Sequence, residues 1–168
     1  LLPTYGGFLI EKEIQALSQV MHDVERPLTI IMGGAKIETK IGIMRKFVSQ
    51  ADHFLVGGGL GNTFLAAEGF DVGESLYEED KKAVAQEILL EAEALEDQFH
   101  IPTDVVVADE VKEDAKKLDI PAEDVMGDMK ILDIGVNTIK KFEEVIAKSK
   151  TIVWNGPLGL FEMDAFSR

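Results

Sequence analysis

Two lysines one helical turn apart, directly after a glycine pair, are the residues of this sequence best suited to chemistry. The segment Leu28–Lys40 reads LTIIMGGAKIETK, so an apolar run leads into Gly33-Gly34, and Lys36 and Lys40 follow. Ammonium groups beside the backbone N–H groups of a helix start attract anions, phosphate above all. Like charges at this spacing cost a few tenths of a kcal/mol. An anionic ligand would offset that cost and a solvated helix edge would tolerate it, so the lysines alone leave both interpretations open.

Two further glycine-rich turns follow apolar segments later in the chain. Residues 53–56 (HFLV) lead into Gly57-Gly58-Gly59, and residues 151–154 (TIVW) lead into the sequence NGPLG at 155–159. Short apolar runs bounded by glycines are typical of buried strands in a parallel sheet. The carboxyl ends of parallel strands share one edge, where such folds bind ligands. Three glycine turns at that edge predict a phosphate or nucleotide crevice.

The spacing of apolar residues predicts alternating helices and strands. Predicted strands cover residues 28–32, 53–56, 104–108, 131–134 and 151–154. Predicted helices run from about 8 to the segment before Pro27, from the first glycine turn to about 50, and over 60–68, 79–99 and 137–148, the last capped by Asn137 or Thr138. Residues 109–130 are predicted to form an excursion with a turn of helix or a small hairpin.

This alternation predicts an α/β fold, a three-layer, Rossmann-like, doubly wound parallel sheet with helices on both faces. We expect a single domain over 1–168. Residues 1–27 form a leading segment and a helix, and residues 28–168 form the sheet core. Because the chain begins with Leu1, we expect it to be a piece of a longer protein.

Composition excludes several classes of function. The net charge of −14 argues against binding nucleic acid or acidic membrane surfaces, and no apolar run is long enough to span a membrane. The chain has no cysteine, which excludes disulfides and thiolate metal sites and fits a reducing cytoplasm. The three histidines, His22, His53 and His100, have no metal-ligand spacing and are predicted to be structural, so no metal ligand is assigned.

Several known nucleotide and hydrolase motifs are absent. The glycines at 57–59 fail the dinucleotide fingerprint, because its sixth position falls on Asn62 or Phe64. The chain contains no Gly-Lys pair for a Walker-type phosphate loop, no protein-kinase motif and no Gly-x-Ser-x-Gly elbow. The crevice, if it binds a nucleotide, does so by another arrangement.

Taken together, the motifs resemble the nucleotide-binding, C-terminal half of the phosphoglycerate kinase family. The resemblance rests on GGAK at 33–36 with Lys40, GGGLGNTF at 57–64 and, above all, WNGPLGLFE at 154–162. Further matches are GFL at 7–9, EKE at 11–13, VGESL at 72–76 and DVVVAD at 104–109, so the similarity spans the whole chain. It implies that the helix before residue 27 is of the interdomain type.

The resemblance implies reversible phosphoryl transfer between ATP and 3-phosphoglycerate, giving ADP and 1,3-bisphosphoglycerate, with magnesium, in cytoplasmic glycolysis and in a monomeric parent. By position, the lysines that face the travelling phosphoryl group are Lys36 and Lys40. The residues whose backbone lines the nucleotide pocket are, by the same resemblance, Gly34, Ala35, Gly58 and Gly59. The residues that shape the site at the tryptophan turn are Asn155, Pro157, Gly159 and Leu160. Glu162 resembles the carboxylate that holds the ribose hydroxyls.

The chain also departs from the family. The half that binds 3-phosphoglycerate is absent, and the chain ends before the segment whose aspartate serves the metal, so no residue here takes that role. Ile131 stands where many members have a glycine near the adenine. We therefore expect the chain alone to be inactive, since only the donor's site is present. The alternatives are a non-catalytic nucleotide-binding module and, disfavoured by the failed fingerprint, a dinucleotide-dependent reductase.

Overall fold

The computed structural model describes residues 6–22, 24–48, 50–93 and 98–166. Within them the parallel strands are β1 (Leu28–Met32), β2 (His53–Val56), β3 (Phe99–His100) and β7 (Thr151–Asn155). The helices are α1 (Phe8–His22), α2 (Ile41–Phe47), α3 (Gly58–Glu68), α4 (Lys82–Glu93) and α5 (Val136–Lys148). A second group of strands comprises β5 (Leu118–Pro121), β4 (Asp104–Ala108) and β6 (Lys130–Ile134), and two 3-10 turns cover Glu79–Lys81 and Ala122–Asp124.

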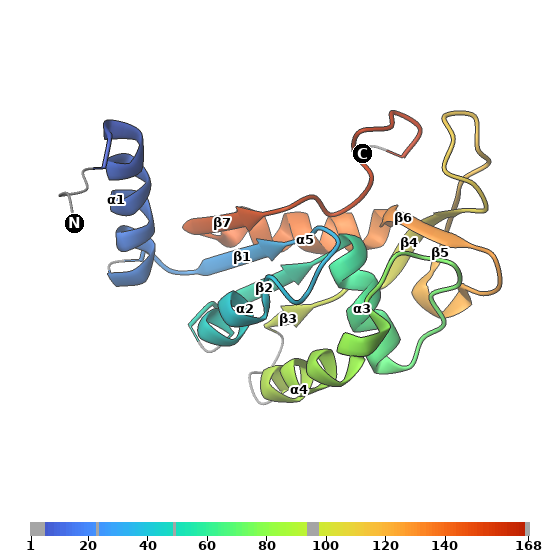
Figure 1. Cartoon of the computed structure of the whole chain (residues 1–168), viewed down its shortest axis with the longest axis horizontal. Helices are drawn as coiled ribbons and strands as arrows, with labels where there is room; N and C mark the ends of the chain where they lie inside the picture. The colour runs from blue at the N-terminus through green and yellow to red at the C-terminus, as the bar shows by residue number, and fades with distance from the viewer. Residues whose placement is uncertain (1–5, 23, 49, 94–97, 167–168) are drawn as a thin grey trace, which may run out of the picture.

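The strands β3, β2, β1 and β7 form one parallel sheet in that order (Figure 1). Every side chain of β1 is buried, as expected for the central strand of a sheet covered on both faces. Met32 at the end of β1 pairs with Val56 of β2 on one side and with Asn155 of β7 on the other. The three glycine-rich turns therefore leave the sheet at the same level.

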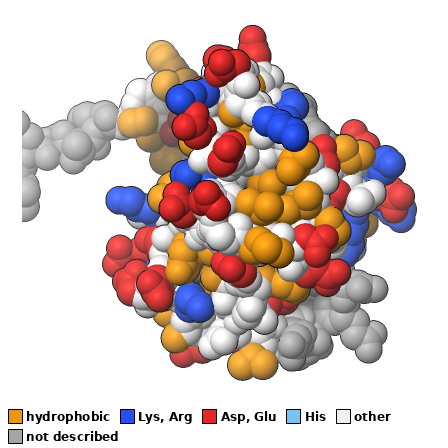
Figure 2. Space-filling view, turned by 90° about the vertical axis from the view of Figure 1, so that its right-hand side faces the viewer, with side chains coloured by type: hydrophobic (Ala, Val, Ile, Leu, Met, Phe, Trp, Pro, Cys, Tyr) orange, Lys and Arg blue, Asp and Glu red, His pale blue; other side chains and the backbone are white. Residues whose placement is uncertain are grey.

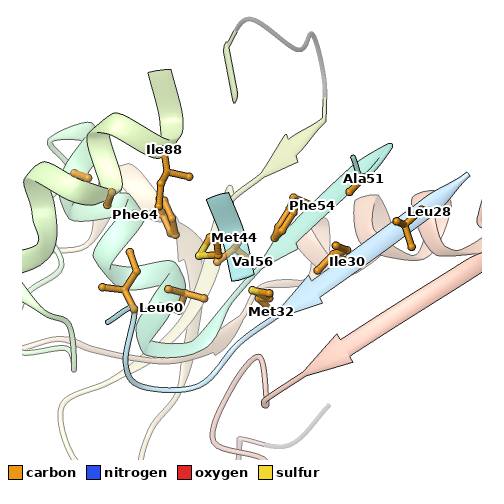
Figure 3. Close-up of a cluster of buried hydrophobic side chains, with 13 residues drawn as sticks. Leu28, Ile30, Met32, Met44, Ala51, Phe54, Val56, Leu60, Phe64 and Ile88 are labelled. Atoms are coloured by element: carbon orange, nitrogen blue, oxygen red, sulfur yellow. The ribbon is translucent and has the colours of Figure 1, made fainter. Parts of the chain in front are cut away.

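Alternate residues of the strands pack on opposite faces of the sheet, as the two-residue period of a strand requires. On one face, Leu28, Ile30 and Met32 of β1 and Phe54 and Val56 of β2 join a buried cluster with α2, α3 and α4 (Figure 3). On the other face, Ile31 and Leu55 pack against Phe142 of α5. The predicted three-layer α/β architecture is confirmed.

The prediction that all strands join one parallel sheet is wrong. The strands β5, β4 and β6 form a separate antiparallel sheet at the end of the domain to which β1 points (Figure 1). The run of Val105, Val106 and Val107 is buried on both sides there, so burial alone did not distinguish the two kinds of sheet. The excursion over 109–130 holds a 3-10 turn, which corresponds to the predicted turn of helix, and β5, which pairs with β4 and not with a second strand of the excursion.

Two predicted helix ends differ from the structure. The helix after the first glycine turn begins at Ile41, so Lys36 precedes it and Lys40 is its N-cap residue. The helix predicted to reach Phe99 is described only to Glu93, and Phe99 lies in β3, where its ring stacks on Phe54 with centroids 5.6 Å apart. The apolar spacing also predicts that Leu17 and Met21 lie on the apolar face of the first helix and Leu95 on the inward face of the helix over 79–99, but these side chains fall outside the described residues.

The predicted cap of α5 is also wrong. The N-cap residue is Gly135, and Thr138 lies inside the helix. The cap comes instead from β4, because the carboxylate of Asp104 accepts hydrogen bonds from the N–H groups of Asn137 (2.8 Å) and Thr138 (2.7 Å). An acidic group beside the N–H groups of a helix start stabilises the helix.

The helix α1 stands apart from the sheet, beyond the amino end of β1 (Figure 1). Its first turns expose the apolar side chains of Phe8, Leu9, Ile10 and Ile14. Within the described residues, no helix combines the length and the apolar character needed to cross a membrane.

Candidate functional site

The three glycine-rich turns are joined to one another by backbone hydrogen bonds at the carboxyl edge of the parallel sheet. The N–H of Gly34 donates to the carbonyl of Pro157, and the N–H of Gly58 donates to that of Leu158, both at 2.7 Å. The N–H of Leu60, in the first turn of α3, donates to the carbonyl of Gly34 at 2.8 Å. Two N–H groups at the start of α3, those of Gly58 and Leu60, are thus bonded within the protein and do not face a ligand.

Glycine is required in these turns because the backbones approach too closely for a side chain. A Cβ atom on Gly33 would lie 1.8 Å from the carbonyl oxygen of Pro157, and one on Gly156 would lie 2.7 Å from that of Gly33. Gly58 has a φ of +63° and Gly156 a φ of +84°, which other residues rarely adopt. These glycines allow the turns to pack together, which the sequence motif alone did not reveal.

A cavity of about 340 Å³ lies beside the joined turns. Eight of the eleven predicted nucleotide-site residues line it: Gly34, Ala35, Gly58, Gly59, Pro157, Gly159, Leu160 and Glu162. Figure 2 looks onto the end of the molecule to which β1 points. It shows hydrophobic side chains gathered near the centre of the view, with Asp and Glu side chains around them. The structure thus brings most of the predicted site residues to one hollow.

The antiparallel sheet supplies the opposite wall of this cavity. Val105 of β4 and Ile131 to Ile134 of β6 line it. Gly159 lies directly against β6, since a Cβ atom there would be 2.0 Å from Oδ1 of Asp133. The strands whose pairing was predicted wrongly therefore contribute to the site itself.

The predicted residues Lys36, Lys40 and Asn155 are not among the residues that line this cavity. The ammonium of Lys40 donates to the carbonyl oxygens of Gly33 and of Asn155, the latter at 3.1 Å. Partial burial of the ammonium lowers the pKa of Lys40 below its ordinary value. An ammonium has three N–H donors, and two of them hold the turn after β1 and the end of β7 together, with no third partner among the described residues. Lys36 is exposed in the turn that leads into α2.

Several residues that line the cavity were not predicted as site residues from the sequence, among them Leu76 and Val111. Leu76 lines it although it is 65% exposed, and Val111 lines it from the segment after β4. An exposed leucine in a predicted loop is a weak signal, but Leu76 lies within the VGESL match and was open to assignment there. Val111 carried no signal of this kind.

A larger cavity, of about 680 Å³, lies between α5 and the tryptophan turn. It is lined mainly by apolar side chains, including Ile31, Phe142 and Trp154. It shares Asp133, Ile134 and the 157–159 segment with the smaller cavity. Neither cavity has a lysine among its lining residues, but of the two only the smaller one is lined by Gly34, Gly58 and Gly59 of the first two glycine turns.

The described residues do not form a metal site. No group of three or more His, Asp or Glu side chains among them could hold a metal ion. Divalent magnesium prefers oxygen ligands and is commonly held by one or two carboxylates together with substrate phosphates. The part of the chain that the structure describes therefore does not fit a protein-built magnesium cage.

The junction between β4 and α5 borders the site and depends on one ionised group. Asp104 is 6% exposed, and its Oδ1 atom also accepts the Thr138 hydroxyl at 2.6 Å. Burial alone would raise the pKa of Asp104. The bonds from the Thr138 hydroxyl and from the N–H groups of Asn137 and Thr138 outweigh burial and hold that pKa below its ordinary value.

Comparison with known proteins gives a consistent match along the whole chain. The family model described as phosphoglycerate kinase matches residues 1–168. Phosphoglycerate kinases from Zymomonas mobilis subsp. mobilis and from Roseiflexus sp. are 42% and 40% identical to the chain, over 99% of its length in each case. The chain spans 42% of the length of each of these relatives.

Solved structures agree with this match. The structure of phosphoglycerate kinase from Coxiella burnetii superposes with a TM-score of 0.92 at 39% identity, over 96% of this chain and 42% of that one. The crystal structure of phosphoglycerate kinase from Pyrococcus horikoshii gives a TM-score of 0.76 at 30% identity, over 96% of this chain and 41% of that one. This chain therefore belongs to the phosphoglycerate kinase family.

Proposed function

We propose that this chain is the nucleotide-binding part of an enzyme that transfers a phosphoryl group between ATP and 3-phosphoglycerate. In that reaction the bond between the γ-phosphorus and the bridging oxygen of ATP breaks. A bond from the phosphorus to a carboxylate oxygen of 3-phosphoglycerate forms, which gives ADP and 1,3-bisphosphoglycerate. The observation that carries the proposal is the cavity beside three joined glycine turns in a chain of this family.

We propose that the residues lining the cavity contact the nucleotide. The small residues Gly34, Ala35, Gly58 and Gly59 allow close approach of the ligand to the backbone, and Pro157, Gly159 and Leu160 form an apolar side. Glu162 lies exposed among the lining residues, where its carboxylate can accept hydrogen bonds from ribose hydroxyls. Asn155 shapes the site through its carbonyl, which accepts the N–H of Gly33 at 3.0 Å.

We assign Lys36 and Lys40 to the transferring phosphoryl group. Phosphoryl transfer requires positioning and positive charge near the oxygens that carry developing charge, and little covalent chemistry from the protein. The Lys40 ammonium is fixed by two carbonyls, so it presents its remaining donor without the cost of ordering a flexible side chain. Magnesium would arrive bound to the nucleotide phosphates.

The acceptor site is proposed to lie in a part of the protein outside this chain. We therefore expect the chain alone to bind nucleotide and to show no turnover, because the donor and acceptor must be held in line. Detectable phosphoryl transfer by the purified chain would contradict this expectation. We place the complete protein in the cytoplasm, as a monomer in glycolysis.

A titration of the chain with Mg-ADP, followed by amide NMR shifts, tests the nucleotide site. We expect saturable shifts clustered at residues 33–40, 57–62 and 155–160. Replacing the fixed cation, Lys40→Ala, should weaken binding by about tenfold, as expected for loss of one charge-assisted hydrogen bond. The variant Lys46→Ala, which removes an exposed lysine from the last turn of α2, is the matched control.

Two outcomes of the titration would contradict the proposal. Absence of shifts from a folded wild-type chain would mean that these turns do not form a sufficient nucleotide site. Preference for NADH over ADP would favour the dinucleotide-dependent reductase instead.

A further inference from the structure

Residues 76–81 cross between α3 and the turn that carries the two lysines, and we call them the 76–81 strap. On the α3 side, Nδ2 of Asn62 donates to the carbonyl of Leu76 at 3.1 Å, and the N–H of Glu78 donates to Oγ1 of Thr63 at 3.1 Å. The Thr63 hydroxyl in turn donates to the carbonyl of Gly59 at 2.9 Å. Asn62 and Thr63 are buried, so the strap is attached to fixed groups of α3.

On its other side the strap contacts the lysine turn. The carboxylate of Glu78 accepts the backbone N–H of Ile37, which directly follows Lys36. The Lys81 ammonium lies 3.6 Å from Oε1 of Glu38, a contact of modest value because Glu38 is exposed. The Glu78 bond is therefore the stronger of these two contacts.

The lysine turn needs such a partner because it lies outside the helix. Residues 36–40 precede α2, so the N–H of Ile37 has no intrahelical acceptor. The Ile37 side chain is fully buried and fixes one side of the turn. The Glu78 carboxylate supplies the remaining acceptor, and the position of Lys36 depends on it.

We propose that Glu78 is a positioning residue that holds the Lys36–Lys40 turn in place for the nucleotide phosphates, a role that rests on the function proposed above. A negative charge beside an anion site weakens anion binding through space. Glu78 therefore favours nucleotide binding only through its hydrogen bond to the backbone. A role through geometry and a role through charge predict opposite effects of removing the carboxylate.

Amide hydrogen exchange of the chain without ligand tests the contact directly. Glu78→Ala should speed exchange of the Ile37 amide by about tenfold or more, as expected for loss of a part-buried hydrogen bond. Glu78→Gln keeps an acceptor oxygen and should preserve most of the protection. Glu79→Ala, which removes the same charge from an exposed neighbour in the strap, is the control and should leave exchange unchanged.

Glu78→Asp gives a second, milder variant that keeps the charge but is one methylene shorter. It should also speed exchange at Ile37, and it decides the question if Glu78→Ala does not fold. Unchanged exchange at Ile37 in Glu78→Asp and in any folded Glu78→Ala would overturn the proposal.

Titration with Mg-ADP tests the consequence for the site. Glu78→Ala should raise the Kd by about tenfold, with recovery to within about twofold of wild type in Glu78→Gln. Tighter binding in both variants would show a role through charge and would overturn the proposal. If the wild-type chain does not bind Mg-ADP, the proposed function fails, while the exchange of Ile37 still decides whether Glu78 holds the turn.

Discussion

The two junctions that border the candidate site are built in different ways. At the carboxyl edge of the parallel sheet, the turns at Gly33, Gly58 and Pro157 are joined by backbone groups, with no room for a Cβ atom at Gly33. Between β4 and α5, the carboxylate of Asp104 accepts three bonds, from the N–H groups of Asn137 and Thr138 and from the Thr138 hydroxyl. The first junction depends mainly on the close fit of backbone groups, whereas the second depends on the ionisation of one carboxylate. The cavity is thus bordered by two junctions that are held together by different kinds of interaction.

The largest effect should come from adding one methyl group to the backbone junction. Gly33→Ala places a carbon 1.8 Å from the carbonyl oxygen of Pro157, and should destabilise the chain by about 3 kcal/mol or more through overpacking. Gly42→Ala is the matched control, because Gly42 lies in α2 with nothing near its Cβ position. That change should stabilise by about 0.5–1 kcal/mol. Denaturant unfolding measures both, and similar values for the two variants would refute the close approach.

Removing the carboxylate junction should have a somewhat smaller effect. Asp104→Ala leaves the N–H groups of Asn137 and Thr138 without their acceptor in a buried position, and should cost about 2–3 kcal/mol. Asp114→Ala, at an exposed position, should change stability by less than about 0.5 kcal/mol. The comparison is made by denaturant unfolding, and equal stabilities would show that α5 does not depend on this cap.

The smallest effect, and the one that separates the junctions, is in their response to pH. Because the folded chain holds the pKa of Asp104 below its ordinary value, the charged group contributes stability above the unfolded pKa. That contribution is lost as the pH falls through the folded pKa. The stability difference between wild type and Asp104→Asn should therefore shrink below about pH 4, the ordinary aspartate pKa.

The cost of Gly33→Ala should stay constant over the same range. Unfolding curves at a series of pH values, from neutral to about pH 3, give both differences. A difference for Asp104→Asn that does not change with pH would mean that the junction depends on shape alone, as the glycine junction does.

Local sequence patterns predicted the parts of the fold that short segments determine. The apolar runs of β1, β2 and β7 and the glycine turns after them lie where predicted, because burial and turn geometry act over a few residues. The antiparallel sheet was missed because Val105, Val106 and Val107 would be equally suited to either kind of sheet. Phe99 was placed in a helix because its spacing fits one, whereas contact with Phe54 and Phe64 places it in a strand.

The candidate site was predictable where a motif names it and not where the tertiary fold builds it. Residues of the three glycine turns could be assigned from the family motifs, and most of them line one cavity. The wall from Val105 and Ile134 depends on the pairing of β4 with β6, which the sequence did not indicate. The Asp104 cap of α5 joins residues more than thirty positions apart, a distance at which capping patterns carry no information.

The tryptophan turn has a consequence for optical measurements. Trp154 is the only tryptophan of the chain, and this residue is 64% exposed at the edge of the parallel sheet. Its indole N–H donates to the carbonyl of Gly156 at 2.8 Å, so the fluorophore is tied to the turn that borders both cavities. Intrinsic emission from this chain therefore comes from one residue beside the candidate site. A change in its intensity or wavelength reports on that turn without any added label.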